Sequence, residues 1–108
     1  MYYIMEKLEK FAEIFKALSD PTRFRLLKLL GDCGPGVCNG GPLCVNALSH
    51  RLGVTQSAVS QHLRILKHAG LVRGERHGSF MHYALDPDGM EKCKAGLSEA
   101  FGDKFKIG

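Results

Sequence analysis

Residues 44–85 carry the pattern that most constrains the fold: two short helical patterns joined by a glycine-containing turn and followed at once by a hairpin pattern. We predict one helix from Cys44 to Leu52, which Gly53 ends, and a second that Thr55 caps and that runs to Ala69, with Gly70 closing it. Apolar residues recur at helical spacing on one side of each helix, at Val45, Leu48 and Leu52 and at Val59, Leu63 and Leu66. Two short helices joined in this way are typical of a helix-turn-helix unit.

The segment after Gly70 changes from helical to strand character. His77-Gly78 predicts a tight two-residue turn, because glycine at its second position tolerates the positive φ that such a turn requires. The two arms, Leu71 to Arg76 and Ser79 to Leu85, then form an antiparallel hairpin. We expect its apolar positions to complete the core, and they are Leu71, Val72, Tyr83 and Leu85.

A long amphipathic helix precedes this unit. From Tyr2 to Leu18, apolar residues recur at alternating spacings of four and three, as a narrow stripe of Ile4, Leu8, Phe11, Phe15 and Leu18. Such a stripe packs on its own domain or on another helix across a dimer, and the sequence leaves both open.

Two further helices are marked by their first residues. Asp20 is a good N-cap and Pro21 suits the first helical position, and we expect Gly31 to end the helix that they begin. This helix is apolar on most sides and is expected to be central, with Phe24, Leu26, Leu27, Leu29 and Leu30. Asp86 and Pro87 begin a last helix whose stripe consists of Met90, Cys93, Leu97 and Phe101. The expected fold class is therefore mainly α with a β-hairpin wing, a winged helix-turn-helix, and 108 residues fit one such domain over 1–108.

The second face of the Thr55–Ala69 helix carries side chains of the kind that enter a DNA major groove. They are Gln56, Ser57, Ser60, Gln61, Arg64 and Lys67. Glutamine reads adenine edges, arginine reads guanine or holds phosphate, and serine bonds either base or backbone. No acidic residue occurs between Arg51 and Gly74, whereas a merely solvated helix face usually mixes charge signs. We therefore predict a DNA-reading helix, with His62 at the edge of this face, either partly buried or touching a phosphate.

The expected hairpin has a basic tip. Arg73, Arg76 and His77 lie at or near it, which suits contact with the DNA backbone or minor groove. A hairpin that only completed the core would not need these residues. The formal net charge of +4 is compatible with nucleic acid but does not by itself identify it as the partner.

The sequence resembles the ArsR/SmtB family of metal-sensing repressors from bacteria and archaea. Three stretches carry the likeness: Phe15 to Arg23, Leu43-Cys44-Val45, and Thr55 to Leu63 continuing through Leu71-Val72. The resemblance implies a homodimer held by the first and last helices, two recognition helices that read a near-palindromic operator, and release from DNA when an inducer binds. The dimer contacts would come from Ile4, Leu8, Phe11, Phe15, Met90, Leu97 and Phe101.

The inducer sites of this family match the chain only in part. The arsenic and cadmium sensors often carry Leu-Cys-Val-Cys-Asp-Leu at the start of the first helix of the DNA-binding unit. Here Leu43-Cys44-Val45 matches, but Asn46 stands where the second cysteine would be. The zinc site on the last helix of other members requires histidine, and the last helix predicted here contains none. We therefore expect that zinc site to be absent.

Three cysteines, Cys33, Cys38 and Cys44, lie on or beside a glycine-rich segment from Gly31 to Leu43. Soft thiolates favour soft ions, and three thiolates suit a pyramidal trivalent arsenic or antimony centre. We expect As(III), Sb(III) or a soft divalent metal as the inducer, with no cofactor required. Cys93 would complete such a site across the dimer or serve as a small buried hydrophobe. Two alternatives stay open. In the first, two of the thiols form a disulfide and sense oxidants or sulfur species. In the second, the thiols have no sensing role.

Other classes of protein fit the sequence less well. No Cys–His–acid arrangement, phosphate-binding glycine motif or Cys-x-x-Cys pair indicates an enzyme. The apolar runs are too short for a membrane helix and the N-terminus lacks a signal-peptide pattern, so we expect no membrane partner and a cytoplasmic location. A winged-helix module that binds protein rather than DNA is the alternative of another class.

Overall fold

The computed structural model describes residues 2–32 and 43–102. The elements run, in chain order, α1 (Tyr2–Leu18), α2 (Pro21–Asp32), β1 (Leu43–Cys44), α3 (Val45–Leu52), α4 (Gln56–His68), β2 (Val72–His77), β3 (Phe80–Leu85) and α5 (Pro87–Phe101). The chain is mainly helical and carries an antiparallel hairpin after its two short helices. The predicted winged helix-turn-helix is confirmed.

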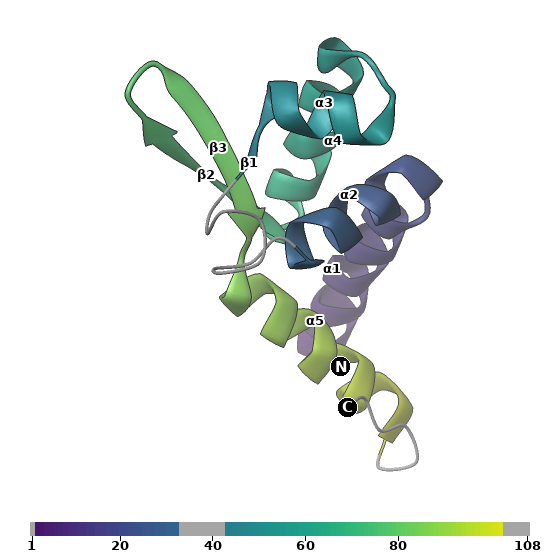
Figure 1. Ribbon diagram of the computed structural model, residues 1–108. Helices are drawn as coiled ribbons and strands as arrows, with labels where there is room; N and C mark the ends of the chain where they lie inside the picture. The colour runs from purple at the N-terminus through teal and green to yellow at the C-terminus, as the bar shows by residue number, and fades with distance from the viewer. Residues whose placement is uncertain (1, 33–42, 103–108) are drawn as a thin grey trace.

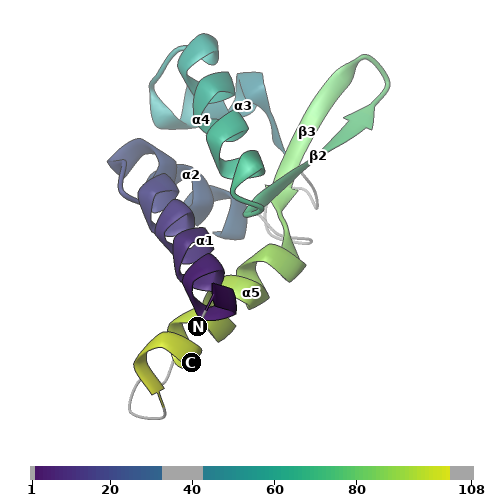
Figure 2. The ribbon, with the colours of Figure 1, turned by 180° about the vertical axis from the view of Figure 1, so that it is seen from behind.

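The elements are arranged toward two ends of the molecule (Figure 1). The tip of the β2–β3 hairpin and helices α3 and α4 lie toward one end, α5 and the N-terminal part of α1 lie toward the other, and α2 lies between them. Figure 2 shows the same arrangement from behind, with the hairpin projecting beyond the helices. The elements predicted to read DNA are thus separated from those predicted to form a dimer.

The core lies where α2, α3, α4 and the start of the hairpin meet. The largest fully buried side chains are Leu26, Leu48, Val59, Leu63, Leu66, Leu71 and Val72. Burial of each such side chain contributes roughly 1.5–3 kcal/mol relative to leaving it exposed. The predicted inward positions of α3 and α4 are confirmed, because all of them are buried or pack against the buried set.

Backbone caps hold the turn between α3 and α4. Gly53 ends α3 with a φ of 68°, a left-handed conformation that glycine adopts at little cost, and its N–H donates to the Ser49 carbonyl. Thr55 caps α4, because its Oγ1 accepts a hydrogen bond from the Ala58 N–H at 3.1 Å. The Ser49 hydroxyl also donates to the Val54 carbonyl. Hydrogen bonds therefore fix both ends of the turn, as the sequence predicted for Gly53 and Thr55.

Replacing Thr55 by alanine is expected to lower the free energy of unfolding by about 1 kcal/mol, because the Ala58 N–H loses its acceptor. Urea denaturation followed by circular dichroism measures the change. Thr55→Ser keeps the acceptor oxygen and is the matched control. An alanine variant as stable as the parent protein would show that Thr55 does not cap α4.

One expectation about α2 is wrong, while its central place is confirmed by the buried Leu26, Leu27 and Leu30. Gly31 does not end this helix, which continues to Asp32. A Cβ at residue 31 would lie 3.3 Å from Leu85 Cδ1, so the glycine allows close packing of α2 on β3 rather than a turn. Phe24 is 59% exposed, because the core covers only one side of α2.

The hairpin turn lies one residue later than predicted. Gly78 and Ser79 form the two-residue turn between the paired His77 and Phe80, so the arms are 72–77 and 80–85 rather than 71–76 and 79–85. Gly78 has a φ of 65°. It occupies the first central position, where both common two-residue hairpin turns require a positive φ. A sequence with a single glycine in the turn allows either placement, and the pairing of the two arms decides between them.

The sequence did not indicate a third strand. Leu43–Cys44 forms β1 and pairs antiparallel with β3, which gives the order β1-β3-β2. Two residues are too few to show the alternation of a strand, and the edge of β3 supplies the hydrogen-bonding groups that hold them extended. The predicted helix start at Cys44 is therefore one residue early, because Cys44 is the N-cap of α3 and the last residue of β1.

Two glycines let α5 approach the rest of the molecule closely. A Cβ at Gly89 would lie 1.6 Å from the Gly70 oxygen, and one at Gly96 would lie 1.2 Å from Phe11 Cζ. Asp86 caps α5 as predicted, and its Oδ1 accepts from the Gly89 N–H at 3.2 Å. The start of α5 is thus placed against the end of α4, and its middle against α1.

Candidate nucleic-acid interface

The outer face of α4 is exposed along the whole helix. Every side chain predicted to read DNA on this face is exposed in the structure. These residues are Gln56, Ser57, Ser60, Gln61, Arg64 and Lys67. The opposite face is anchored in the core by Val59, Leu63 and Leu66, each exposed by 1% or less. The outer face of α4 therefore presents amides, hydroxyls and cations, and α4 carries no carboxylate.

Gln56, the first residue of α4, is held by α3. Its Nε2 donates to Asn46 Oδ1 at 3.0 Å. A glutamine reads adenine with its amide oxygen and amide N–H together. Because Asn46 already accepts one N–H of the Gln56 amide, this bond limits the orientations in which the amide can meet a base. The sequence reasoning missed this role of Asn46, which it treated only as the residue in place of a second cysteine.

The two arginines of the β2–β3 hairpin lie at different heights. Arg76 pairs with Met81 beside the tip, whereas Arg73 pairs with Ala84 near the base, so the prediction that Arg73 lies at or near the tip is wrong. Arg73 and Arg76 are exposed, and the side chain of His77 lies outside the described residues. Arg73 Nε lies 3.5 Å from Glu75 Oε1, so a carboxylate accompanies the predicted phosphate contacts of the wing. Phe80 is 66% exposed where it pairs with His77 at the tip. The sequence reasoning did not single out Phe80, because an apolar residue in a strand is ordinarily assigned to the core.

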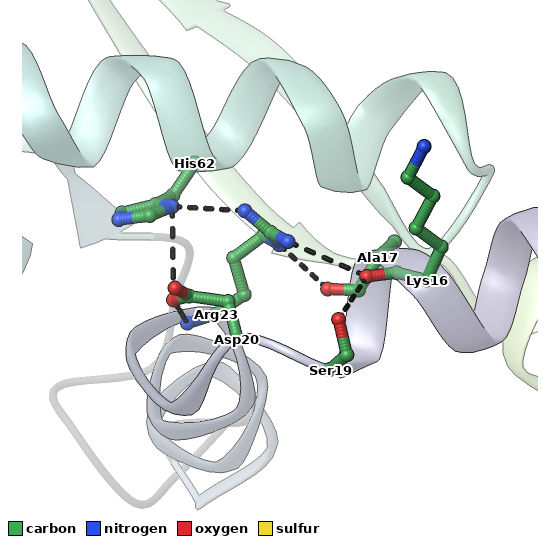
Figure 3. A network of polar contacts seen from close by, with 6 residues as sticks. All are labelled: Lys16, Ala17, Ser19, Asp20, Arg23 and His62. Carbon is green, nitrogen blue, oxygen red and sulfur yellow. Dashed lines mark hydrogen bonds and ion pairs between the residues drawn. The ribbon is translucent and has the colours of Figure 1, made fainter.

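His62 lies at the edge of α4 that faces the start of α2 (Figure 3). Its Nδ1 lies 3.4 Å from Arg23 Nη1 and 4.0 Å from Asp20 Oδ2, and its side chain is 22% exposed. The structure thus shows the partly buried alternative for His62. The phosphate contact of this residue stays a prediction.

Arg23 joins the end of α1 to the start of α2. Its Nε donates to the Ala17 carbonyl at 2.6 Å and its Nη2 donates to the Lys16 carbonyl at 3.4 Å. Its backbone N–H donates to Asp20 Oδ2 at 3.0 Å. This last bond, together with the positive charge of the Arg23 guanidinium, holds the pKa of Asp20 below its ordinary value. The ionised carboxylate therefore stabilises the folded state at neutral pH, and this contribution is lost as the pH falls through the folded-state pKa.

Residues 20–73 match the family described as bacterial regulatory protein, arsR family. The chain is also 43% identical over 84 residues to an uncharacterised HTH-type transcriptional regulator of Methanocaldococcus jannaschii, which covers 78% of this chain and 86% of that protein. This chain belongs to the arsR family. The matched segment begins at the N-cap of α2 and ends in β2, so it contains the entire helix-turn-helix.

Two further relatives extend the likeness of this arsR-family chain. It is 36% identical over 83 residues to the arsenical resistance operon repressor of Bacillus subtilis, over 77% of this chain and 72% of that one. Its fold is similar to that of a homodimeric winged helix-turn-helix DNA-binding domain from Mycobacterium bovis, with a TM-score of 0.66, 25% identity and coverage of 93% and 84% of the two chains. The chain is a transcription regulator with a DNA-binding winged helix-turn-helix, and not an enzyme. Among its described helices, none is long and apolar enough to span a membrane.

The candidate inducer site of this arsR-family regulator is described at Cys44 alone. Cys44 is half-buried with a free thiol, and as the N-cap of α3 its side chain makes no capping hydrogen bond. Cys33 and Cys38 lie outside the described residues. Within 2–32 and 43–102, no three His, Cys, Asp or Glu side chains are placed to hold a metal ion. A metal site at Cys44 therefore needs ligands from residues 33–42 or from a second copy of the chain.

Cys93 lies apart, in the core-facing side of α5. It is 9% exposed, and burial raises the pKa of its thiol. A protonated, buried thiol is a poor metal ligand and a poor nucleophile. These properties favour the small buried hydrophobe over the inducer ligand among the alternatives for Cys93.

Thiol alkylation tests this difference between the two described cysteines. In a variant with Cys33→Ser and Cys38→Ser, iodoacetamide at about pH 8 is expected to modify Cys44 roughly tenfold or more faster than Cys93, because the thiolate is the reacting species. Mass spectrometry of peptides taken over time measures both rates. Equal rates would contradict the protection of Cys93 by α5.

Helices α1 and α5 expose apolar side chains. Leu8, Phe15 and Phe101 are exposed by 48%, 42% and 60%. Three other residues predicted to form a dimer are half-buried, namely Phe11, Met90 and Leu97. The side chain of Ile4 lies outside the described residues. Exposed aromatic and aliphatic groups on two adjacent helices are typical of a surface that a protein covers.

The predicted stripe of α1 is divided between two faces. Leu18 packs on the core together with Ile14 and the buried Ala17, whereas Leu8 and Phe15 are exposed. A hollow of about 600 Å³ lies between α1, the end of α4 and α5. Phe11 and Ile14 line this hollow, whereas Leu8 and Phe15 do not. One side of α1 therefore packs within the chain, and Leu8 and Phe15 are exposed outside both the core and the hollow.

Proposed function

We propose that this chain is a homodimeric transcriptional repressor that binds a near-palindromic operator and is released from it by a thiophilic inducer. The outer face of α4 is the observation that carries the DNA-binding part, because its exposed amides, hydroxyls and cations include no carboxylate. Such a face approaches phosphates without repulsion and offers hydrogen bonds to base edges.

Each part of this interface has a distinct role. Gln56, Ser57, Ser60 and Gln61 contact base edges in the major groove, and Arg64 and Lys67 contact guanine or phosphate. Arg73, Arg76 and His77 bring the wing to the backbone or minor groove of the flanking DNA. Base contacts supply sequence preference, and the phosphate contacts supply affinity that falls with salt.

A second copy of this chain covers the exposed apolar residues of α1 and α5. Helix α5 and the N-terminal part of α1 lie at the end of the molecule opposite the wing, so a dimer through this end leaves both α4 helices free. The similar domain from Mycobacterium bovis is homodimeric. A two-fold axis then places two α4 helices about one DNA turn apart, and a near-palindromic operator matches this symmetry.

Cys44 connects the proposed inducer site to the DNA-reading unit. It caps α3 and pairs with His82 of β3, so a ligand that moves Cys44 acts on the helix-turn-helix and on the wing together. With Cys33 and Cys38 it supplies three thiolates, a donor set suited to As(III), Sb(III) or a soft divalent metal. The arsenical resistance operon repressor of Bacillus subtilis is a relative that supports this class of inducer. A coupling free energy of about 1–3 kcal/mol between inducer and operator lowers operator affinity roughly 5–150-fold.

A fluorescence anisotropy titration tests the proposal. The reduced protein is bound to a labelled duplex from upstream of its own gene, and arsenite, antimonite, cadmium, zinc and peroxide are added in turn. We expect release by a thiophilic ion, and retention of the complex in a variant with Cys33→Ser, Cys38→Ser and Cys44→Ser. Cys93→Ser is the matched control and is expected to respond like the parent protein.

The other outcomes of this titration separate the alternatives. Release by peroxide alone would make the thiols redox sensors, and arsenite and the metal ions would then have no role. Binding to DNA without sequence preference would favour a winged-helix module that binds protein.

A further inference from the structure

His62 lies at the rim of the DNA-reading face of α4. It follows the exposed Gln61, and it lies one helical turn from the half-buried Ala58 and from the buried Leu66. Its side chain is 22% exposed. When a helix lies in the major groove, side chains at the rim of its exposed face are nearest to the sugar–phosphate backbone, and such contacts fix the position of the helix on DNA.

The contact with Arg23 favours one tautomer of His62. A guanidinium only donates hydrogen bonds, so Arg23 Nη1, at 3.4 Å, requires a lone pair on His62 Nδ1. A neutral imidazole with its lone pair on Nδ1 carries its proton on Nε2. Figure 3 shows the second ring nitrogen on the side of the ring that points away from Arg23 and Asp20.

Asp20 favours the opposite tautomer. Its carboxylate only accepts hydrogen bonds, and its Oδ2 lies 4.0 Å from the same Nδ1. Arg23 is closer to this nitrogen, and its guanidinium is held in place because Nε donates to the Ala17 carbonyl at 2.6 Å. The carboxylate of Asp20 is meanwhile bonded to the Arg23 backbone N–H at 3.0 Å. The two neighbours of His62 thus oppose each other, and Arg23 has the shorter contact.

We propose that His62 donates a hydrogen bond from a neutral Nε2–H to a phosphate oxygen of the operator, and that Arg23 is the positioning residue that keeps the proton on Nε2. This inference rests on the proposed DNA binding. A neutral donor adds affinity without releasing a counterion, so His62 contributes to binding but, unlike Arg64, not to its salt dependence. Arg23 also ties this donor to the C-terminal end of α1.

The tautomer is measured first, on the protein without DNA. Long-range proton–nitrogen correlation spectra of protein with isotope-labelled histidine, at a pH where the ring is neutral, are expected to show the His62 proton on Nε2. In Arg23→Met, which keeps an apolar stem but has no donor, we expect the proton to move to Nδ1, toward Asp20. A proton on Nδ1 in the parent protein, or an unchanged tautomer in Arg23→Met, would overturn the role of Arg23.

Operator affinity then tests the phosphate contact. Asparagine places its amide N–H near the position of Nδ1, and glutamine places it near Nε2. We therefore expect His62→Asn to weaken operator binding roughly fivefold to tenfold and His62→Gln to stay within roughly twofold of the parent protein. Equal losses in both variants, or no loss in either, would overturn a donor at Nε2.

Salt dependence separates a neutral donor from a cation. A plot of log affinity against log salt concentration for His62→Asn is expected to run parallel to that of the parent protein, whereas the control Arg64→Ala lowers the slope by about 0.9. A lowered slope in His62→Asn would show that His62 binds as a cation and would overturn the proposal. A parent protein without affinity for its promoter would refute the proposed function, and the tautomer result would stand independently of it.

Discussion

Gly89→Ala is expected to lower the free energy of unfolding by about 3 kcal/mol, near the upper end for overpacking of a close contact. The added Cβ would lie 1.6 Å from the Gly70 oxygen and 2.7 Å from the Gly70 carbonyl carbon. Both are backbone atoms, so no change of rotamer relieves the overlap and α5 must move away from the end of α4. Gly70 closes α4 with a φ of 81°, so its carbonyl cannot turn away without disturbing that helix end.

Urea denaturation followed by circular dichroism measures this loss, and Gly31→Ala is the matched control. Among the described residues, the Cβ added at residue 31 meets only Leu85 Cδ1, at 3.3 Å, which is the far end of a side chain. Alanine also gains up to about 1 kcal/mol of helix propensity over glycine in a helix interior, so this variant is expected to stay within about 1 kcal/mol of the parent protein. Equal losses in the two variants would contradict the close approach of α5 to Gly70.

The double variant Ser60→Glu with Arg64→Glu is expected to lower operator affinity at least about a hundredfold. It places two carboxylates on the outer face of α4, where they repel DNA phosphates, and it removes a cation. Both residues are exposed, so the free energy of unfolding is expected to change by no more than about 0.5 kcal/mol. Fluorescence anisotropy on the promoter duplex measures the affinity, and denaturation confirms the fold.

Lys28→Glu is the control for the charge change at Arg64, because both exchanges replace an exposed cation by an anion. Lys28 pairs with Asp32 at 3.0 Å on the surface of α2, and an exposed pair of this kind contributes only about 0–1 kcal/mol. We expect this variant to keep operator affinity within roughly threefold at about 0.15 M salt. The single variant Arg64→Glu is measured beside it, and equal losses in Lys28→Glu and Arg64→Glu would mean that overall charge, and not the face of α4, supplies the affinity.

Signals that act over a few residues predicted the DNA-reading unit well. Gly53 and Thr55 determine the ends of α3 and α4 through bonds to Ser49 and Ala58, which are near neighbours in the chain. The period of apolar residues then selects which face of α4 is buried, and therefore which face is exposed. The exposed set on α4 follows from these local features without knowledge of the rest of the fold.

Contacts between distant residues were not predictable in the same way. Arg23 and His62 are separated by 39 residues, and no local pattern pairs them. In the sequence alone, Gly31 predicts a helix end, and only the folded structure shows that it packs against Leu85. Strand β1 likewise depends on its pairing with the edge of β3. The sequence also did not show which apolar residues of α1 are exposed. An apolar stripe has the same sequence pattern whether it packs on the core of its own chain or on a second copy. Tertiary packing therefore decided the features that the sequence left open.

The affinity of the parent protein for its promoter duplex, compared with a shuffled duplex of the same length and composition, tests most directly whether α4 reads DNA sequence. Competition anisotropy at one salt concentration, about 0.15 M, is expected to give at least about a thousandfold preference for the promoter. Equal affinities for the two duplexes would contradict sequence reading by the outer face of α4.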